Sequence, residues 1–207
     1  MSWVYNNFAS PEAIFVTGSS AGSIPSPYYA VELADHYSDA RVTQLGDGSG
    51  GYRGQGEVNP QEIWGAMDIV SDWPQFKEVA VADFTFEQLY IAAAKRHPEI
   101  TFAAYDSAED EVQRWYLKLR NIEPDTLLAN LDANQADIRA EVKNFRSFIA
   151  GGELHTILRR PEFYRYHVDG KRVSDWVGEL ANSGTAGDIR CRTCATPQLI
   201  PEKMEDL

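Results

Sequence analysis

Apolar and polar residues alternate along the chain in short blocks that predict strands and helices in turn. Apolar runs rich in β-branched and aromatic residues predict four strands, at residues 13–17, 41–45, 100–105 and 148–150. Apolar residues at helical spacing predict helices at residues 28–37, 84–97, 109–119, 132–145 and 173–181. Because strands alternate with helices, we predict an α/β fold with a mainly parallel sheet and helices on both faces.

Three further segments lack such a pattern. Residues 52–76 contain Trp64, Trp73 and two prolines without a clean period, which predicts a long excursion over one end of the sheet. Excursions of that length usually form lids or binding segments. Residues 168–171 carry the turn signal Val-Asp-Gly-Lys, and residues 183–207 are predicted to be a polar tail. The whole chain is expected to form a single domain.

The charge of the chain excludes several kinds of partner. Acidic residues outnumber basic residues 31 to 19, which gives a formal net charge of −12. A basic surface for phosphate backbones or anionic lipids is therefore not expected, and we predict no nucleic-acid or membrane-surface partner. The longest apolar runs, such as residues 89–94, are far shorter than the roughly 18 residues of a membrane-spanning helix. The amino terminus shows no signal-peptide pattern.

Cys191 and Cys194 are the two cysteines of the chain and form one C-x-x-C pair. Two thiols do not complete the four-ligand site that structural zinc prefers. The polar surroundings also differ from those of a redox motif, which opens a helix after a strand. We therefore expect a local disulfide wherever the protein reaches an oxidising compartment, with no apolar burial around it, and we expect no metal.

The segment Gly-Ser-Ser-Ala-Gly at residues 18–22 matches the pattern G-x-S-x-G and follows a predicted strand. In enzymes with this pattern, the central serine lies on a strained strand-to-helix turn that holds its hydroxyl above the edge of a sheet. The two glycines are expected to be needed because the chain turns sharply and packs closely there. Ser20 is therefore the candidate nucleophile.

A serine hydroxyl is a weak nucleophile, so it needs a general base and a carboxylate that orients the base. His155 follows the fourth predicted strand after a flexible glycine pair, where it could reach Ser20. The other histidines fit less well, because each has a context that favours a structural role: His36 in a helix, His97 at a helix end, and His167 in an aromatic strand.

The loop after the third predicted strand supplies the candidates for the acid. It offers Asp106, Glu109, Asp110 and Glu111. Periodicity does not choose among them, and an acidic helix start is also ordinary because carboxylates suit the helix dipole.

Three motifs in order resemble one protein family. They are Val-Thr-Gly-Ser-Ser-Ala-Gly-Ser at residues 16–23, Asp-x-x-Gln at residues 110–113, and, after a late histidine, Val-Asp-Gly-Lys-Arg-Val-Ser-Asp-Trp at residues 168–176. Together they resemble the pectin acetylesterase family, which includes the Notum-type carboxylesterases, over almost the whole chain. The resemblance implies an α/β-hydrolase fold, no cofactor, and a secreted or extracytoplasmic location.

The same resemblance implies a serine esterase whose triad falls on Ser20, Asp110 and His155. Asp106 stays the second choice for the acid because it lies closer to the strand end. The implied substrate is an O-acyl ester such as an acetyl group on a glycan, although a net charge of −12 would repel polyanionic pectin. Thioesterases and proteases use the same triad, so the triad does not exclude them.

The oxyanion hole is where this sequence departs from the family. The backbone N–H of Ala21 can supply one donor. The family's upstream glycine-rich segment has no counterpart, because residues 1–17 contain no glycine. We therefore expect the carboxyl-terminal part of a longer enzyme, with the strand at residues 13–17 as an exposed sheet edge. Poor solubility, self-association through that edge or little esterase activity is expected. The alternative function is an impaired remnant or binding module that retains the triad residues.

Overall fold

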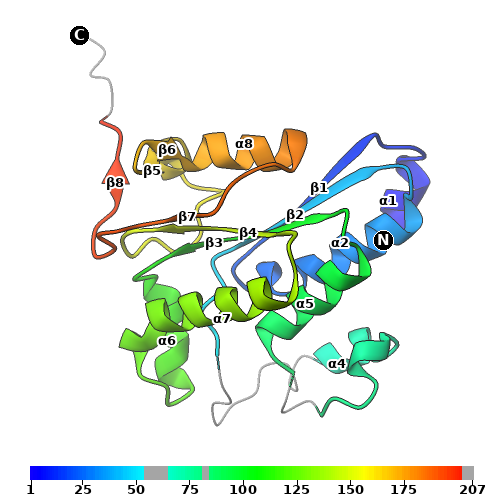
Figure 1. Cartoon of the computed structure of the whole chain (residues 1–207), viewed down its shortest axis with the longest axis horizontal. Coiled ribbons are helices and arrows are strands. Elements are labelled where there is room, and N and C mark those ends of the chain that lie inside the picture. Colours follow the sequence, from blue (N-terminus) through cyan, green and yellow to red (C-terminus); the bar gives the residue numbers. More distant parts are fainter. Residues whose placement is uncertain (54–64, 81–83, 202–207) are drawn as a thin grey trace.

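The computed structural model describes residues 1–53, 65–80 and 84–201. A five-stranded parallel sheet lies at the centre, in the order β1-β2-β3-β4-β7. Its strands are β1 (Ala13–Ser19), β2 (Arg41–Asp47), β3 (Thr101–Ser107), β4 (Phe145–Ala150) and β7 (Ile189–Arg190). Helices surround this sheet, so the predicted α/β class is confirmed (Figure 1). In the described part of the chain β1 is an edge strand, as predicted.

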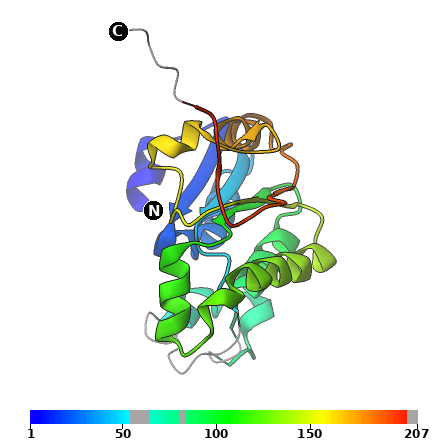
Figure 2. The same cartoon turned by 90° about the vertical axis from the view of Figure 1, so that its left-hand side faces the viewer.

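Helices cover the sheet from both sides. Three lie on one side, namely α2 (Ser26–His36), α5 (Phe86–Arg96) and α7 (Leu127–Glu141), while α8 (Val173–Ser183) lies on the other (Figures 1 and 2). The other helical segments are α1 (Ser2–Asn7), η1 (Ser20–Ser23), α4 (Ala66–Val70), η2 (Pro74–Phe76), α6 (Glu111–Leu119), η4 (Pro124–Thr126) and η5 (Pro161–Tyr164).

Each side of the sheet buries its own apolar core. Along β3, Phe102 and Ala104 belong to the core that α2 and α5 cover, whereas Ala103 and Tyr105 belong to the core beneath α8. Side chains of a strand point alternately to opposite faces, so a strand covered on both faces must be apolar throughout. This explains why the strands appear in the sequence as continuous apolar runs.

Two helix ends follow local signals in the sequence. Thr85 and Gln88 form a capping box at the start of α5, which satisfies backbone N–H groups that lack a partner within the helix. Gly184 ends α8 in the left-handed conformation, with φ at 68°, and its N–H donates back to the Leu180 carbonyl.

A second, smaller sheet has the order β6-β5-β8. Its strands are β5 (Tyr166–Val168), β6 (Lys171–Arg172) and β8 (Gln198–Leu199). Asp169 and Gly170 both have positive φ, at 48° and 86°, as a tight hairpin turn of this kind requires. The turn predicted at residues 168–171 is confirmed.

The prediction of a polar tail at residues 183–207 is wrong for its middle part. β7 joins the main sheet beside β4, and β8 pairs with β5 in the small sheet. Each of these strands has two residues, so neither contains enough positions for a periodic pattern. Their pairing depends on distant strands and not on local sequence.

The helix predicted at residues 132–145 is wrong at both ends. α7 begins at Leu127 and ends at Glu141, and Phe145 opens β4 with its side chain in the core. Between them, the side-chain amide of Asn144 donates to three carbonyl oxygens, those of Ala94, His97 and Ile100. These bonds hold the chain against α5 and its C-terminal turn, so the helix does not continue into the strand.

The excursion predicted at residues 52–76 is described only in part, since residues 54–64, including Trp64, lie outside the described residues. In the described part, Trp73 and Phe76 are buried at 5% and 4% exposure. Trp73 stacks on Tyr28 of α2 with 5.7 Å between ring centroids. The end of the excursion therefore belongs to the core.

Candidate active site

The carboxyl ends of the parallel strands meet at one edge of the sheet. Four residues near these ends are neighbours in register: Ser19, Asp47, Tyr105 and Phe148. The segments that follow β1, β2, β3 and β4 therefore leave the sheet at neighbouring points, where open α/β sheets form their binding crevices. The candidate site residues follow three of these strands: Ser20, Asp110 and His155.

Ser20 directly follows β1 and is the first residue of η1. Its φ of 56° is in the left-handed region, which is strained for a residue with a side chain. The hydroxyls of Ser23 and Ser49 donate to the Ser20 carbonyl at 2.8 and 2.7 Å and so hold the turn. A Cβ at Gly18 would lie 2.0 Å from the Gly22 carbonyl oxygen, so position 18 requires glycine. A Cβ at Gly22 would meet nothing within 4 Å among the described residues, so the expected need for that glycine is wrong.

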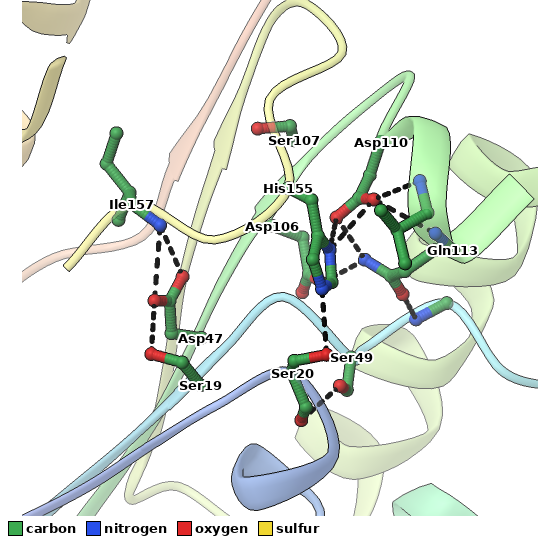
Figure 3. Close-up of polar contacts among 12 residues, drawn as sticks. Ser19, Ser20, Asp47, Ser49, Asp106, Ser107, Asp110, Gln113, His155 and Ile157 are labelled. Atoms are coloured by element: carbon green, nitrogen blue, oxygen red, sulfur yellow. Dashed lines mark hydrogen bonds and ion pairs between the residues drawn. The ribbon is translucent and has the colours of Figure 1, made fainter. Parts of the chain in front are cut away.

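His155 joins the serine to a carboxylate (Figure 3). Its Nε2 lies 2.8 Å from Ser20 Oγ, and its Nδ1 lies 2.8 Å from Asp110 Oδ2. Because an ionised carboxylate only accepts hydrogen bonds, Nδ1 carries the hydrogen and Nε2 accepts from the serine hydroxyl. The predicted convergence of these three side chains is observed.

Asp110 is held in place by the start of α6. It caps the helix, and its Oδ1 accepts from the backbone N–H groups of Val112 and Gln113 at 3.0 and 2.9 Å. The Gln113 side-chain amide also donates to Asp110 Oδ2 at 3.1 Å. Asp110 is fully buried. The start of α6 thus fixes the carboxylate that meets His155.

Asp106, the second choice for the acid, has a different environment. It is fully buried, and its Oδ1 accepts from the Gly50 N–H and the Gln113 side-chain amide, both at 2.9 Å. Its Oδ2 has no hydrogen-bond partner among the described residues. Burial raises the pKa of Asp106 to about 8. At neutral pH Asp106 is therefore mostly an uncharged carboxylic acid, linked to Asp110 through Gln113.

The remaining candidate residues lie elsewhere. Glu109 Oε2 accepts from Arg114, and Glu111 is exposed. His36 stacks on Tyr5 with 3.7 Å between ring centroids. The ring nitrogens of His97 contact Asp35 and Glu99, and His167 Nδ1 accepts from the Gly170 N–H. The structural contexts expected for these histidines are observed.

Sequence reasoning missed Asp47, the last residue of β2. It is fully buried, and its carboxylate accepts from the Ser19 hydroxyl at 2.8 Å and from the N–H groups of Ile157 and Leu158 at 2.9 to 3.1 Å. Burial raises the pKa of Asp47, and the two backbone N–H groups oppose that shift. Asp47 thus ties the nucleophile turn to the loop that carries His155 (Figure 3). The sequence signal that could have identified Asp47 is its position between Gly46 and Gly48 at the end of a strand.

The two glycines before His155 permit close packing and not free movement. A Cβ at Gly151 would lie 2.2 Å from the Thr196 carbonyl oxygen, and Gly152 has φ at 92° with Pro197 close by. The Gly152 N–H donates to the Cys194 carbonyl at 2.9 Å. The expectation of a flexible glycine pair is therefore wrong, because the residues near 194–197 clamp this segment.

Cys191 and Cys194 are joined by a disulfide, as expected. Cys191 is only 2% exposed and belongs to the core beneath α8. The expectation that the pair lacks apolar burial is wrong, because β7 draws the preceding residues into the main sheet.

A cavity of about 190 Å³ opens beside Ser20. Ala21, the predicted oxyanion donor, and Ser49 line it next to the nucleophile. Most other lining residues are apolar and come from α2, α4, α5 and the segments just before α2 and α5, among them Ile24, Tyr28, Ile69, Val70, Phe84 and Leu89.

Comparisons with known proteins identify no family, since no family model matches the chain and no curated protein is significantly similar to it. Within the described residues, no helix has the length and apolar character needed to cross a membrane. Nor do residues 1–53, 65–80 and 84–201 contain three or more metal-ligating side chains grouped to hold an ion.

Proposed function

We propose that this protein is a serine carboxylic ester hydrolase. The observation that carries the proposal is the hydrogen-bonded chain from Ser20 through His155 to Asp110, at the carboxyl edge of a parallel sheet. A nucleophile, a base and an orienting acid in this geometry are what serine acyl transfer requires. The resemblance of three sequence motifs to the pectin acetylesterase family supports the same chemistry.

The reaction proceeds through an acyl-serine. Ser20 Oγ attacks the ester carbonyl carbon as its proton passes to His155 Nε2. The tetrahedral oxyanion then collapses, the bond to the alcohol oxygen breaks, and the alcohol leaves with the proton from Nε2. Water next gives a proton to Nε2 and attacks the acyl carbonyl. The second tetrahedral intermediate collapses, its bond to Ser20 Oγ breaks, and the proton on Nε2 returns to Oγ as the acid leaves. Asp110 orients His155 and stabilises its protonated form throughout.

We assign the oxyanion hole to two backbone N–H groups. Ala21 follows the nucleophile at the first turn of η1, where an N–H has no partner within the helix. Ser49 lines the same cavity, and its N–H donates to no acceptor among the described residues, whereas the N–H groups of Gly48, Gly50 and Gly51 each do. We therefore assign the second donor to the loop after β2 and not to an upstream segment.

The substrate is an O-acyl ester, with a carbohydrate alcohol as the leaving group favoured by the family resemblance. The net charge of −12 disfavours a polyanionic glycan. A neutral acylated sugar therefore fits better than pectin.

Covalent labelling of the serine tests the proposal directly. A fluorophosphonate probe should label the wild-type chain at Ser20, and p-nitrophenyl esters should be hydrolysed. The Ser20→Ala and His155→Ala variants should lose at least 1000-fold in kcat, because the base and nucleophile act as a unit. Ser10→Ala, at an exposed position before β1, is the matched control and should keep full activity.

Two results would overturn the proposal in different ways. A folded wild-type chain that is neither labelled nor active on any ester would show that the triad does not react. Labelling of Ser20 without turnover would favour the alternative, an impaired remnant that retains the triad residues.

We also propose that the chain self-associates through β1. No strand among the described residues pairs with its outer edge, and natural sheets usually protect such edges with charged residues or proline. Thr17 is exposed on this strand. Sedimentation velocity should show dimers for the wild type and fewer dimers for Thr17→Lys; a wild-type monomer at all concentrations would refute this.

A further inference from the structure

We propose that Asp106 is a positioning residue that holds the loop after β2 against the triad. The inference rests on the proposed esterase function, because this loop carries the Ser49 N–H that we assign to the oxyanion hole. Within the described part of the chain, Asp106 forms hydrogen bonds with neither Ser20 nor His155. It therefore acts through the groups that it holds.

Asp106 reaches the loop directly and through Gln113 (Figure 3). Its Oδ1 accepts from the Gly50 N–H at 2.9 Å and from the side-chain amide of Gln113 at 2.9 Å. The amide oxygen of Gln113 in turn accepts from the Gly51 N–H at 2.9 Å. Both side chains are fully buried. The two peptide groups that follow Ser49 are therefore oriented by Asp106 and its hydrogen-bond partner.

The loop is fixed closely at this point. A Cβ at Gly50 would lie 2.3 Å from Asp106 Oδ2, so a side chain at position 50 would displace the carboxyl group. The side-chain amide of Asn134 donates to the Gly50 and Tyr52 carbonyls at 2.8 and 3.1 Å. Buried side chains from β3, α6 and α7 thus hold residues 50–52, and a change at Asp106 should shift the loop that contains Ser49.

The hydrogen bonds around Asp106 and Asp110 indicate that only one of the two carries a charge. The Gln113 amide donates to both, so the two carboxyl groups are neighbours. Asp110 also accepts from two backbone N–H groups and from His155, whereas Asp106 Oδ2 has no partner among the described residues. Neighbouring buried carboxyl groups do not readily both ionise, and the one with more donors keeps the charge. Asp106 therefore holds the loop as an uncharged acid.

Ionisation of Asp106 should disturb the site. Burial raises its pKa to about 8, so the group is mostly uncharged at neutral pH and becomes a carboxylate above pH 8. A second negative charge beside Asp110 then opposes the negative charge that forms on the oxyanion. The reaction should therefore slow as pH rises through about 8. The titratable groups that face Asp106 are Asp47 of β2, Tyr52 after β2, Tyr90 of α5, Tyr105 of β3 and Asp110 before α6.

The test follows the reaction of Ser20 against pH in the wild type and in Asp106→Asn. We would measure the rate constant of fluorophosphonate labelling and kcat for p-nitrophenyl butanoate from about pH 6 to about pH 9.5. At pH 7 the two proteins should differ by less than about tenfold, because asparagine is uncharged and keeps the acceptor oxygen. At the alkaline end the wild-type labelling rate should fall at least about fivefold, with a midpoint near pH 8. The rate for Asp106→Asn should not fall.

Two further variants separate positioning from general effects of charge and folding. Glu111→Gln is the matched control, since it makes the same chemical change beside Asp110 at an exposed position, and its pH profile should follow the wild type. Asp106→Leu removes the acceptor, so kcat at pH 7 should fall by about 10- to 100-fold with little change in KM. Circular dichroism across the pH range shows whether each protein stays folded.

The outcomes separate this inference from the proposed function. Wild-type labelling at pH 7, with the same alkaline fall in the wild type and Asp106→Asn or with no fall in either, would overturn the role of Asp106 and leave the esterase proposal intact. A wild-type fall that coincides with unfolding would do the same. Loss of more than about 100-fold in Asp106→Asn at pH 7 would instead mark Asp106 as the triad acid. Absence of wild-type labelling at every pH would refute the esterase and this inference together.

Discussion

Ser20 is part of two surfaces of different chemistry, a polar wall and an apolar wall. In the polar wall, His155 forms hydrogen bonds with Ser20 and Asp110. Asp47 accepts from the Ser19 hydroxyl and from the N–H groups of Ile157 and Leu158. These bonds measure 2.8 to 3.1 Å. The apolar wall is that of the cavity that Ser20 also lines. Substitutions in the polar wall should therefore change how fast any ester reacts, while those in the apolar wall should change which ester reacts.

The largest effect expected within the polar wall is that of Asp110→Asn. Asparagine also caps helices, so α6 should stay folded, but it does not stabilise the imidazolium. We expect kcat for p-nitrophenyl esters to fall by about 10⁴-fold, a loss seen when a triad aspartate becomes asparagine. Asp106→Asn is the matched control and should cost less than tenfold. The reverse order would assign the triad acid to Asp106.

The second prediction concerns stability and Asp106. Burial holds its pKa near 8 in the folded chain, with Asp110 and Asp47 adding to the shift, whereas an unfolded aspartate has a pKa near 3.9. Unfolding therefore releases a proton between about pH 4 and pH 8, and this group lowers stability as pH rises through that window, by at most about 1.4 kcal/mol per pH unit.

Asp106→Asn should remove this dependence. Urea unfolding at pH 5, 6 and 7 should show that the free energy of unfolding of the variant falls less with pH than that of the wild type. Parallel pH profiles for the two proteins would mean that Asp106 is ionised in the folded state.

The third prediction tests the link between the two loops of the polar wall. Asp47→Asn keeps the shape of the side chain but places an amide group near the N–H groups of Ile157 and Leu158, which need acceptors. We expect kcat and the fluorophosphonate labelling rate to fall by about 10- to 100-fold, because small misplacements of a catalytic group are costly. Asp137→Asn, at an exposed ion pair, is the control. Unchanged labelling with lower stability alone would indicate a purely structural role.

The smallest effect is expected from the disulfide that supports the histidine segment. In the double variant Cys191→Ser, Cys194→Ser, the free energy of unfolding should fall by about 2 kcal/mol, as expected for a short closed loop. Its kcat should fall by less than tenfold. Urea unfolding measures the first and p-nitrophenyl ester hydrolysis the second. Intact mass before and after reduction and alkylation shows whether the pair is oxidised; two free thiols in protein from an oxidising compartment would contradict the bond.

The parts of the fold that the sequence predicted are those with strong local patterns. The continuous apolar runs of β1 and β3 require that both faces of the sheet are covered. Gly18 is required because the Gly22 carbonyl leaves no room for a side chain at position 18. The failures share one property. β7 and β8 have two residues each, and the end of α7 depends on Asn144 reaching carbonyl oxygens near α5. Pairings between distant segments leave no period in the local sequence.

The sequence alone determined the alternation of strands and helices, the strained serine turn and the set of acids and histidines near the strand ends, because each follows from local patterning and turn chemistry. Only the tertiary structure decided that Asp110 rather than Asp106 meets His155, that Asp47 holds the histidine segment, and that an apolar cavity borders Ser20. The reason is physical: the register of parallel strands and the packing of helices set these distances between residues far apart in the chain, and local preferences do not fix either.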